Sequence, residues 1–360
     1  MDLRRLSRLL LVGAALLLAG GCKDKSAAGG DPSAGGRVSL NGAGATFPFP
    51  LYSKWMAEYN RQHPDVRINY QSIGSGGGIR QIIAGTVDFG ATDAPMTEDE
   101  AKKAPRPIVH IPTTLGAVAV TYNVPGVTQA LKLTPEVLAE IYLGTVSKWN
   151  DPKLAGLNPG VSLPDKNISV IYRSDGSGTT AVFSEYLAKV SSAWKEKVGV
   201  GKSVKWPTGL GAKGNEGVTG QVKTTPGSVG YVELAYATQN EMPVAAIKNQ
   251  AGEFVEPKLA AVSAAAKGQP LPESLHVSIT NPPGQGAYPI ASYTYLLVYE
   301  DMKEPREAQA LAGFLWWAIH DGQKFAEALH YAPLPPLVVA KVEARLKDLT
   351  ANGKKLLAAN

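Results

Sequence analysis

Hydrophobic side chains recur along this chain with two spacings, one typical of helices and the other typical of strands. Leu51, Trp55 and Tyr59 stand four residues apart, which predicts a helix over residues 48–62 that begins at its prolines. The segment VRINYQS at 66–72 alternates apolar and polar positions, which predicts a strand.

The same two spacings continue to the end of the chain. Further predicted strands are VDFGATD, AVAVTYNV, ISVIYRSD and SYTYLLVYE. Further predicted helices are a short one around 79–83 closed by Gly85, TPEVLAEIYLG with Thr134 as its cap and Gly144 at its end, 182–190, and 311–318. This alternation of strands and helices predicts an α/β protein with covered sheets.

The first 21 residues follow neither spacing. A basic segment, MDLRRLSRLL, runs into an apolar stretch of about a dozen residues, LLLVGAALLLAGG, whereas a membrane-spanning helix needs roughly 20. The segment therefore predicts an export signal peptide over residues 1–21. Cys22, the single cysteine of the sequence, follows small residues in an arrangement that resembles a bacterial lipobox, so we expect it to be acylated after cleavage.

Plain secretion with an incidental cysteine is the alternative to lipidation at Cys22. One cysteine cannot form an internal disulfide. Residues 22–37 are rich in Gly, Ala and Ser and predict a flexible tether, so we expect the folded part to begin near Val38.

Composition and charge narrow the class of protein. The chain has 360 residues, 44% hydrophobic and 19% charged, which is typical of a soluble globular protein long enough for two domains. Of its formal charge of +5, the predicted signal peptide carries +2, since it holds three arginines and one aspartate. The remaining charge is too balanced to favour a nucleic-acid partner.

Three loops share one arrangement, in which a small hydroxyl residue lies among glycines or before prolines where a helix begins. They are GAGATFPFP with Thr46, IGSGGGIRQII with Ser75 as the expected helix cap, and RSDGSGTTAVF with Ser177. A helix N-terminus has about four unpaired N–H groups and the positive end of the helix dipole, so it can bind an anion. Each loop alone could be an ordinary helix cap. Together, the three predict an anion site.

Charged residues at predicted strand ends refine this hypothesis. Arg173 lies within reach of the Ser177 loop, and its guanidinium suits a tetrahedral oxyanion. Asp175 could hold that guanidinium in place or form an Asx-turn. Asp93 ends another strand and could accept a hydrogen bond only from an oxyanion that carries a proton. Sites of this kind discriminate by factors on the order of 10⁴ or more, which favours phosphate over sulfate at neutral pH.

Several long motifs then resemble one family. GAGATFP, YQSIGSGGGIRQIIAGTVDFGATDAP, DGSGTT, KWPTGLGAKGNEGV and PGSVGYVE are similar to the phosphate-binding protein of the bacterial ABC-type phosphate transport system, and the similarity runs from about residue 38 to the C-terminal region. The resemblance implies a periplasmic-binding-protein fold, with two α/β lobes joined by a two-crossover hinge around an interlobe cleft. The chain would cross near IPTTLG and GAYPIAS, giving lobe I at 38–114 and 290–360 and lobe II at 115–289.

The family also implies a hydrogen-bond cage that holds phosphate without reacting with it. Asp93 would accept the phosphate proton, and Asp175 would support the guanidinium of Arg173. The implied cage residues are Thr46, Phe47, Ser75, Asp93, Arg173, Ser177, Gly178 and Thr179. The implied partners are phosphate and the permease subunits of an ABC transporter, with a membrane contact through the lipid at Cys22 on the periplasmic or other extracytoplasmic side. No cofactor or metal is expected.

Other functions stay open at this point. Arsenate protonates as phosphate does, so Asp93 does not exclude it, although it disfavours sulfate. A serine hydrolase is disfavoured because Gly176 immediately precedes Ser177, which breaks the G-x-S-x-G pattern. A phosphohydrolase is disfavoured because the five histidines are scattered and form no metal-ligand motif. We therefore expect a non-catalytic phosphate receptor.

Overall fold

The computed structural model describes residues 36–127 and 129–357. The predicted signal peptide, Cys22 and all but the end of the predicted tether lie outside the described residues. From Arg37 onward the chain forms one compact unit, which begins with a strand at Val38 as expected. No helix in the described ranges is long and apolar enough to span a membrane.

The centre of this unit, over the described residues, is an eight-stranded sheet in the order β2-β1-β3-β11-β4-β8-β6-β7. Its strands are β1 (Val38–Gly44), β2 (Val66–Ser72), β3 (Phe89–Thr92), β4 (Ile108–Asn123), β6 (Ser169–Arg173), β7 (Leu210–Ala212), β8 (Ser228–Glu233) and β11 (Ala291–Tyr299). The strands β2, β1 and β3 run parallel to one another, as do β8, β6 and β7. In contrast, β11 and β4 pair antiparallel with their neighbours.

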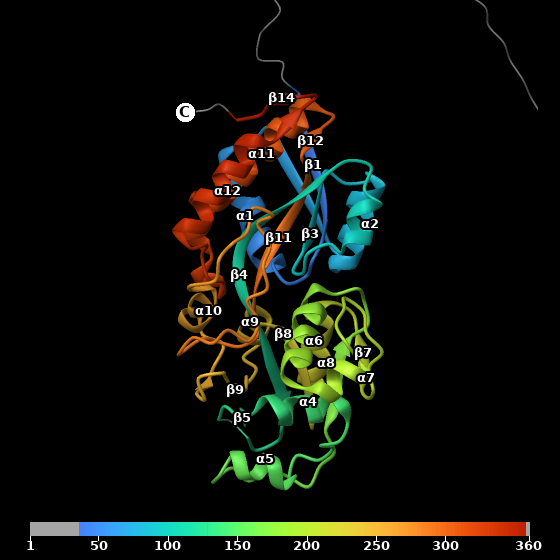
Figure 1. Ribbon diagram of the computed structural model, residues 1–360, viewed down its shortest axis with the longest axis vertical. Coiled ribbons are helices and arrows are strands. Elements are labelled where there is room, and N and C mark those ends of the chain that lie inside the picture. The colour runs from blue at the N-terminus through green and yellow to red at the C-terminus, as the bar shows by residue number, and fades with distance from the viewer. Residues whose placement is uncertain (1–35, 128, 358–360) are drawn as a thin grey trace, which may run out of the picture. The chain divides into compact units, whose positions relative to one another are not determined.

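Strand β4 belongs to two parts of this sheet (Figure 1). Residues 108–117 pair with β11, and residues 118–123 pair with β8. We call β2, β1, β3, β11 and residues 108–117 of β4 the first half-sheet. Residues 118–123 of β4 with β8, β6 and β7 form the second half-sheet.

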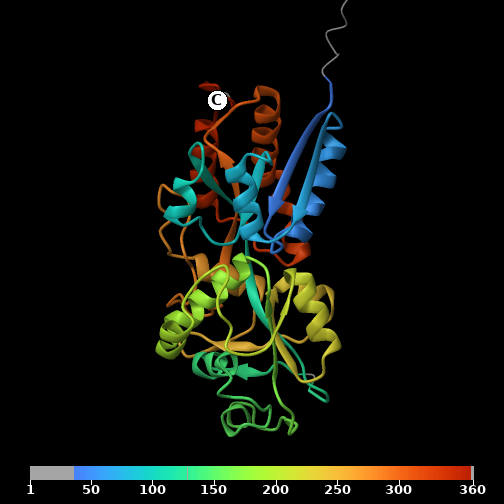
Figure 2. The same cartoon turned by 90° about the vertical axis from the view of Figure 1, so that its right-hand side faces the viewer.

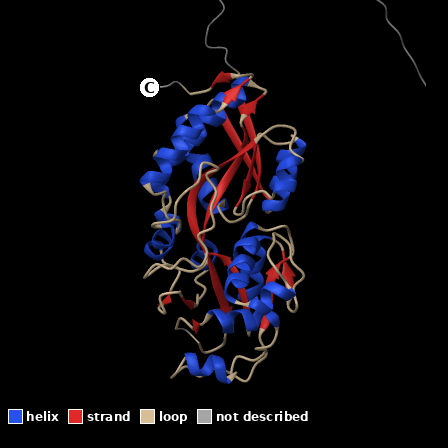
Figure 3. Cartoon of the chain, in the orientation of Figure 1, coloured by secondary structure: helices blue, strands red, loops and turns tan. Residues whose placement is uncertain are grey.

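Helices cover both half-sheets (Figures 2 and 3). Those packed around the first half-sheet are α1 (Phe49–Gln62), α2 (Ser75–Ala84), α11 (Pro305–Ile319) and α12 (Pro336–Asp348), and those around the second are α4 (Pro135–Leu143), α6 (Gly178–Val190), α8 (Gly214–Thr224) and α9 (Leu234–Gln239). The other described helices are α3 (Glu98–Lys102), α5 (Pro152–Leu157), α7 (Ser192–Lys197), α10 (Leu259–Ala266), η1 (Asp321–Phe325) and η2 (Glu327–Leu329). Two small sheets complete the described fold, one of β5 (Lys132–Leu133), β9 (Ala246–Lys248) and β10 (Phe254–Val255), the other of β12 (Asp301–Met302), β13 (Thr350–Ala351) and β14 (Lys354–Lys355). The α/β alternation expected from the sequence is confirmed.

Local signals account for several of these boundaries. The hydroxyl of Thr134 accepts a hydrogen bond from the N–H of Val137 and caps α4, and Gly144 ends that helix with φ of 78°. The expectation that Ser75 caps α2 is wrong. Gly74 takes the cap position with φ of 85°, so Ser75 becomes the first helical residue and its hydroxyl is available for other contacts.

Strand β4 also starts earlier than predicted. The prediction began with the apolar run AVAVTYNV, whereas the strand already includes residues 108–116, where apolar positions are interrupted by His110, Pro112 and two threonines. Threonine is compatible with that buried segment because its hydroxyls find acceptors: Thr113 donates to the Thr294 carbonyl at 3.2 Å, and Thr114 donates to the Ala332 carbonyl at 2.8 Å.

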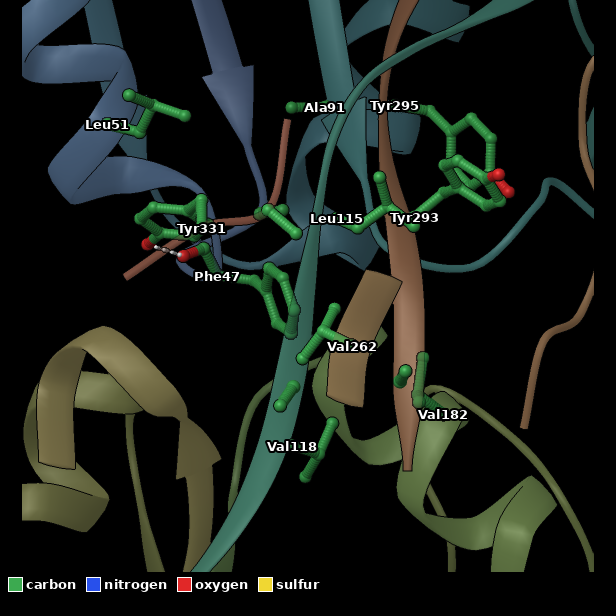
Figure 4. Packing of buried hydrophobic residues seen from close by; sticks show 14 of the residues in the cluster. Phe47, Leu51, Ala91, Leu115, Val118, Val182, Val262, Tyr293, Tyr295 and Tyr331 are labelled. Atoms are coloured by element: carbon green, nitrogen blue, oxygen red, sulfur yellow. Dashed lines mark hydrogen bonds between the residues drawn. The ribbon is translucent and has the colours of Figure 1, made fainter. Parts of the chain in front are cut away.

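The core is continuous past the point where β4 changes partners (Figure 4). The fully buried ring of Phe47 lies there beside Leu115, and Tyr331 donates to the Phe47 carbonyl at 2.6 Å. A side chain at Gly116 would place its Cβ 2.6 Å from the Phe47 ring, so glycine allows the ring to pack directly on the strand. Phe47 thereby fixes the loop after β1 to the middle of the sheet.

Candidate functional site

Two loops from opposite half-sheets meet at the N-termini of α2 and α6. The N–H of Gly76 donates to the Gly176 carbonyl at 2.9 Å, and the N–H of Gly178 donates to the Ser75 hydroxyl at 3.1 Å. A Cβ at Gly178 would lie 2.5 Å from both the Ser75 hydroxyl and an Asp93 carboxylate oxygen. Close approach of the two loops therefore depends on glycine at position 178.

Asp93 lies between these loops at the end of β3 and is 2% exposed. The Thr294 hydroxyl, from β11, donates to its Oδ1 at 2.9 Å. Its Oδ2 is 3.5 Å from the Ser75 hydroxyl, which also accepts the Asp93 N–H at 3.3 Å. Burial raises the pKa of Asp93 to about 7, although Thr294, Arg173 and Ser75 each act to lower it.

Arg173 brings a buried positive charge to the same place from the end of β6. Its Nε and Nη2 donate to the two carboxylate oxygens of Asp175 at 2.8 and 2.6 Å, which is a two-pronged ion pair. Burial acts to raise the pKa of Asp175, but the hydrogen bonds and charge of Arg173 hold it below its usual value. Asp175 also accepts the N–H of Gly214 at 3.0 Å, so the guanidinium has a fixed orientation.

Ser177 caps α6, and its hydroxyl accepts the N–H of Thr180 at 3.0 Å. This partner is a backbone donor and not a general base, so the serine lacks the arrangement of an activated nucleophile. The Ser177 N–H donates to the carbonyl of Lys202 at 2.8 Å. Within the described part of the chain, no group of three or more His, Cys, Asp or Glu residues could hold a metal ion.

Thr46 and Thr179 complete the cluster from the two sides. Thr46, in the loop after β1, is 2% exposed, and its carbonyl accepts the hydroxyl of Tyr236 at 2.6 Å. Thr179, in the first turn of α6, is fully buried, with its hydroxyl 3.4 Å from Arg173 Nη1. The structure thus brings Thr46, Ser75, Asp93, Arg173 and Thr179 together in one buried cluster. The Ser177 hydroxyl instead bonds within its own helix, and the Phe47 ring points into the core.

Sequence reasoning missed three residues of this cluster. Asn215 donates to both Thr46 and Thr179, Thr294 binds Asp93, and the hydroxyl of Tyr231 accepts the N–H of Arg173 at 3.1 Å. Asn215 stands in the motif KGNEGV, which carried a family resemblance but no assigned role. Thr294 and Tyr231 lie in apolar strand segments with no local signal of a polar contact.

This arrangement has the chemistry of a site for a small oxyanion. The positive ends of two helix dipoles and a buried guanidinium converge on it, together with hydroxyl and backbone donors. Asp93 is the acceptor facing the donors, because Asp175 is occupied by Arg173.

Comparison with known proteins agrees with this class of site. A family model described as a PBP superfamily domain matches residues 29–321. The phosphate-binding protein PstS of Xylella fastidiosa strain Temecula1 is 46% identical over 310 residues, covering 85% of this chain and 84% of its own. PstS of Pasteurella multocida is 45% identical over 323 residues, covering 88% and 93%.

Among solved structures, the phosphate-binding protein from Stenotrophomonas maltophilia superposes with a TM-score of 0.65 at 19% identity, covering 85% of this chain and 93% of its own. That similarity shows a shared fold, the two-lobe α/β fold of periplasmic binding proteins. The chain belongs to the PBP superfamily and, within it, to the PstS phosphate-binding proteins.

Proposed function

We propose that this protein binds inorganic phosphate without catalysing a reaction and delivers it to the permease subunits of an ABC-type transporter for import. The observation that carries the proposal is the buried cluster in which many donors face one carboxylate acceptor, Asp93. The names of the PstS relatives support the same ligand.

The proposed contacts follow from the positions of the donors. Thr46 and Phe47 would present backbone N–H groups, and hydroxyls would come from both sides of the cluster. Arg173, oriented by Asp175, would supply charge-assisted hydrogen bonds. The proposed phosphate-binding residues are Thr46, Phe47, Ser75, Asp93, Arg173, Ser177, Gly178 and Thr179.

Asp93 supplies selectivity in this proposal. An ionised carboxylate can accept the proton of hydrogen phosphate, whereas sulfate has no proton at neutral pH and would leave two negative groups facing each other. Loss of a required donor in a desolvated site reduces affinity by orders of magnitude. Arsenate carries the same proton and is the second candidate ligand.

We also propose the lobe boundaries expected from the family, with lobe I at 38–114 and 290–360 and lobe II at 115–289. The change of β4 partners between Ala117 and Val118 supports the first crossover, and the start of β11 at Ala291 supports the second. The cluster draws Ser75 and Asp93 from lobe I and Arg173 from lobe II, so it would lie in the interlobe cleft.

Export to the periplasm or another extracytoplasmic face, with lipid attachment at Cys22, is the final part of the proposal. The basic and apolar segment before Cys22 supports it. Expression of the full chain and of Cys22→Ala with labelled palmitate tests it, because label is expected only on the chain that retains Cys22. Equal label on both would refute lipidation at this residue.

Binding calorimetry on residues 23–360 tests the ligand. Phosphate is expected to bind at least about 10³-fold more tightly than sulfate at pH 8, with arsenate as the third ligand compared. Absence of phosphate binding would refute the proposed function, and equal phosphate and sulfate affinities would refute the role of Asp93. Incubation of metal-supplemented protein with a phosphate ester checks that no turnover occurs.

A further inference from the structure

Asn215 is a fully buried polar residue that the proposed phosphate contacts do not include. It lies in the first turn of α8, next to Gly214, which has φ of 73°. Its amide group reaches Thr46, from the loop after β1, and Thr179, from α6. Asn215 therefore connects hydroxyls that arrive from both half-sheets.

A hydrogen bond from the backbone fixes the orientation of the Asn215 amide. Its Oδ1 accepts the backbone N–H of Glu233 at 2.9 Å, which a side-chain NH₂ group could not do. The NH₂ group must therefore face the threonines. It donates to Thr46 Oγ1 at 2.8 Å and to Thr179 Oγ1 at 3.2 Å, so each of its hydrogens has an acceptor.

These contacts determine what the threonine hydroxyls can still do. A hydroxyl has two acceptor lone pairs and one hydrogen to donate. Thr46 Oγ1 also accepts the backbone N–H of Asn215 at 3.2 Å, and Thr179 Oγ1 also faces Arg173 Nη1 at 3.4 Å. With both lone pairs of each oxygen engaged, both hydroxyls are left to act as donors.

We propose that Asn215 is a positioning residue that orients the hydroxyls of Thr46 and Thr179 as donors toward the bound anion, without itself contacting that anion. The proposal rests on the proposed phosphate-binding function. It explains why an amide, and not a carboxylate, occupies this position: an acidic side chain would accept from both hydroxyls and turn their hydrogens away from the ligand.

Two substitutions separate this role from simple packing. Asn215→Asp keeps the size of the side chain but replaces its donors with acceptors. Asn215→Ala removes the donors and leaves the hydroxyls free to rotate toward the ligand. Positioning predicts a larger loss of phosphate affinity for Asp than for Ala, whereas a packing role predicts the opposite order because Ala leaves a cavity.

Asn158 provides a matched control. It is also buried, and its amide bonds the backbone N–H and carbonyl of Lys132 at 2.8 and 3.1 Å, with no contact to the cluster. Asn158→Asp makes the same chemical change at a purely structural position. It should lower the melting temperature and leave phosphate affinity within about twofold.

The experiment measures phosphate affinity by calorimetry at pH 8, and melting temperature without phosphate, for the wild-type protein and the three variants. Asn215→Asp is expected to lose about 100-fold or more in affinity and Asn215→Ala about tenfold, from the strength of hydrogen bonds to a charged ligand. Equal losses, a larger loss for Ala, or affinities within threefold of wild type would overturn the positioning role. Failure of the wild-type protein to bind phosphate would instead overturn the proposed function.

A double-mutant cycle keeps the test decisive if Asn215→Asp does not fold. Thr46→Val removes one hydroxyl that Asn215 orients, so Asn215→Ala should lose less affinity in the Thr46→Val background than in the wild type. Additive losses would show that Asn215 does not act through Thr46 and would overturn the proposal.

Discussion

At the scale of a single residue, Asp93 can be either ionised or neutral near physiological pH. Its burial favours the neutral form, and its pKa of about 7 places both protonation states near physiological pH. The ionised form accepts a hydrogen bond from a protonated ligand, whereas the neutral form can donate a hydrogen bond to the ligand. The preference of the site between oxyanions is therefore expected to depend on pH.

Sulfate binding should reveal this dependence. Sulfate has no proton to offer, so it should bind the form of the protein in which Asp93 is protonated. Between pH 8 and pH 6 the protonated fraction rises roughly tenfold for a pKa near 7, and sulfate affinity should rise by a similar factor. Calorimetric titration with sulfate between pH 8 and pH 6 measures this change in affinity.

Asp93→Asn is the control for the sulfate titration. The amide donates at every pH, so sulfate affinity should vary little in this variant. A rise as steep as that of the wild-type protein would assign the pH dependence to another group.

Residues of the cluster differ in how far the sequence could predict them. Thr46, Ser75 and Ser177 could be found because hydroxyls among glycines or before prolines at helix starts are a local pattern. Asn215 and Thr294 could not, because their contacts depend on which strands and helices pack together across the sheet. Thr294 reaches Asp93 from a strand about two hundred residues further along the chain.

At the scale of elements, the approach of α6 to α2 should be sensitive to a single methyl group. Gly178→Ala would place a Cβ 2.5 Å from Ser75 Oγ and from Asp93 Oδ2, so the two loops must separate. We expect phosphate affinity to fall by more than about tenfold, the effect of losing one or two charge-assisted hydrogen bonds. Calorimetry on the purified variant measures the loss.

Gly220→Ala is the matched control on a neighbouring helix. Gly220 lies within α8, and a Cβ there would meet nothing within 4 Å. The substitution should leave phosphate affinity unchanged and raise the free energy of unfolding by up to about 1 kcal/mol, because alanine favours the helix. A similar loss of affinity in both alanine variants would contradict the steric explanation.

A second contact between elements joins the Ser177 loop to α3. The ammonium group of Lys202 lies 2.8 Å from Glu100 Oε2, and the backbone carbonyl of Lys202 holds the N–H of Ser177. Both side chains are partly buried, at 13% and 28% exposed. This ion pair joins the two sides of the proposed cleft and should favour its closed arrangement.

A double-mutant cycle with Lys202→Ala and Glu100→Ala checks this contribution to phosphate affinity. Each variant should weaken binding by about two- to fivefold, and the double variant should lose little more than either single one, as expected for a coupling of about 0.5–1 kcal/mol. The effect should shrink at high salt. Fully additive losses would mean that the pair does not act as a unit.

The strands β2, β3, β4, β6 and β11 and the helices α1, α2, α4, α6 and α11 could be predicted because hydrophobic spacing is local, whereas β1, β7, β8, α8, α9 and α12 were not predicted. Two of the predicted elements differ in their bounds for tertiary reasons. The early part of β4 contains threonines whose buried hydroxyls find acceptors in Ala332 and Thr294, and α2 starts at Ser75 because Gly74 takes the cap position with a positive φ of 85°.

At the scale of the whole molecule, periodicity predicted an α/β protein, but the division into two lobes came from family resemblance. Periodicity could not have supplied it, because β4 is one uninterrupted strand whose partners change without any break in the strand itself. Pairing partners are a property of the assembled sheet.

Closure of the two lobes should be visible in solution. In the structure Gly76 and Gly176 are hydrogen-bonded, an arrangement in which the N-termini of α2 and α6 face each other closely. Small-angle X-ray scattering should show a smaller radius of gyration with phosphate than without it, because the ligand links donors from both lobes. An unchanged radius of gyration would contradict a hinge motion. The same comparison can be made with a second ligand by titrating Asp93→Asn with sulfate.

The position of β11 in the sheet has a consequence for the order of folding. This strand lies between β3 and β4, yet a ribosome makes it long after both of them. Until residues 291–299 are made, β3 and β4 each keep an unpaired edge, so the first half-sheet cannot close, whereas all the strands of the second are already available. For the export that we propose, this delay would keep the first half-sheet incomplete until residues 291–299 are made, which favours passage across the membrane before that half folds.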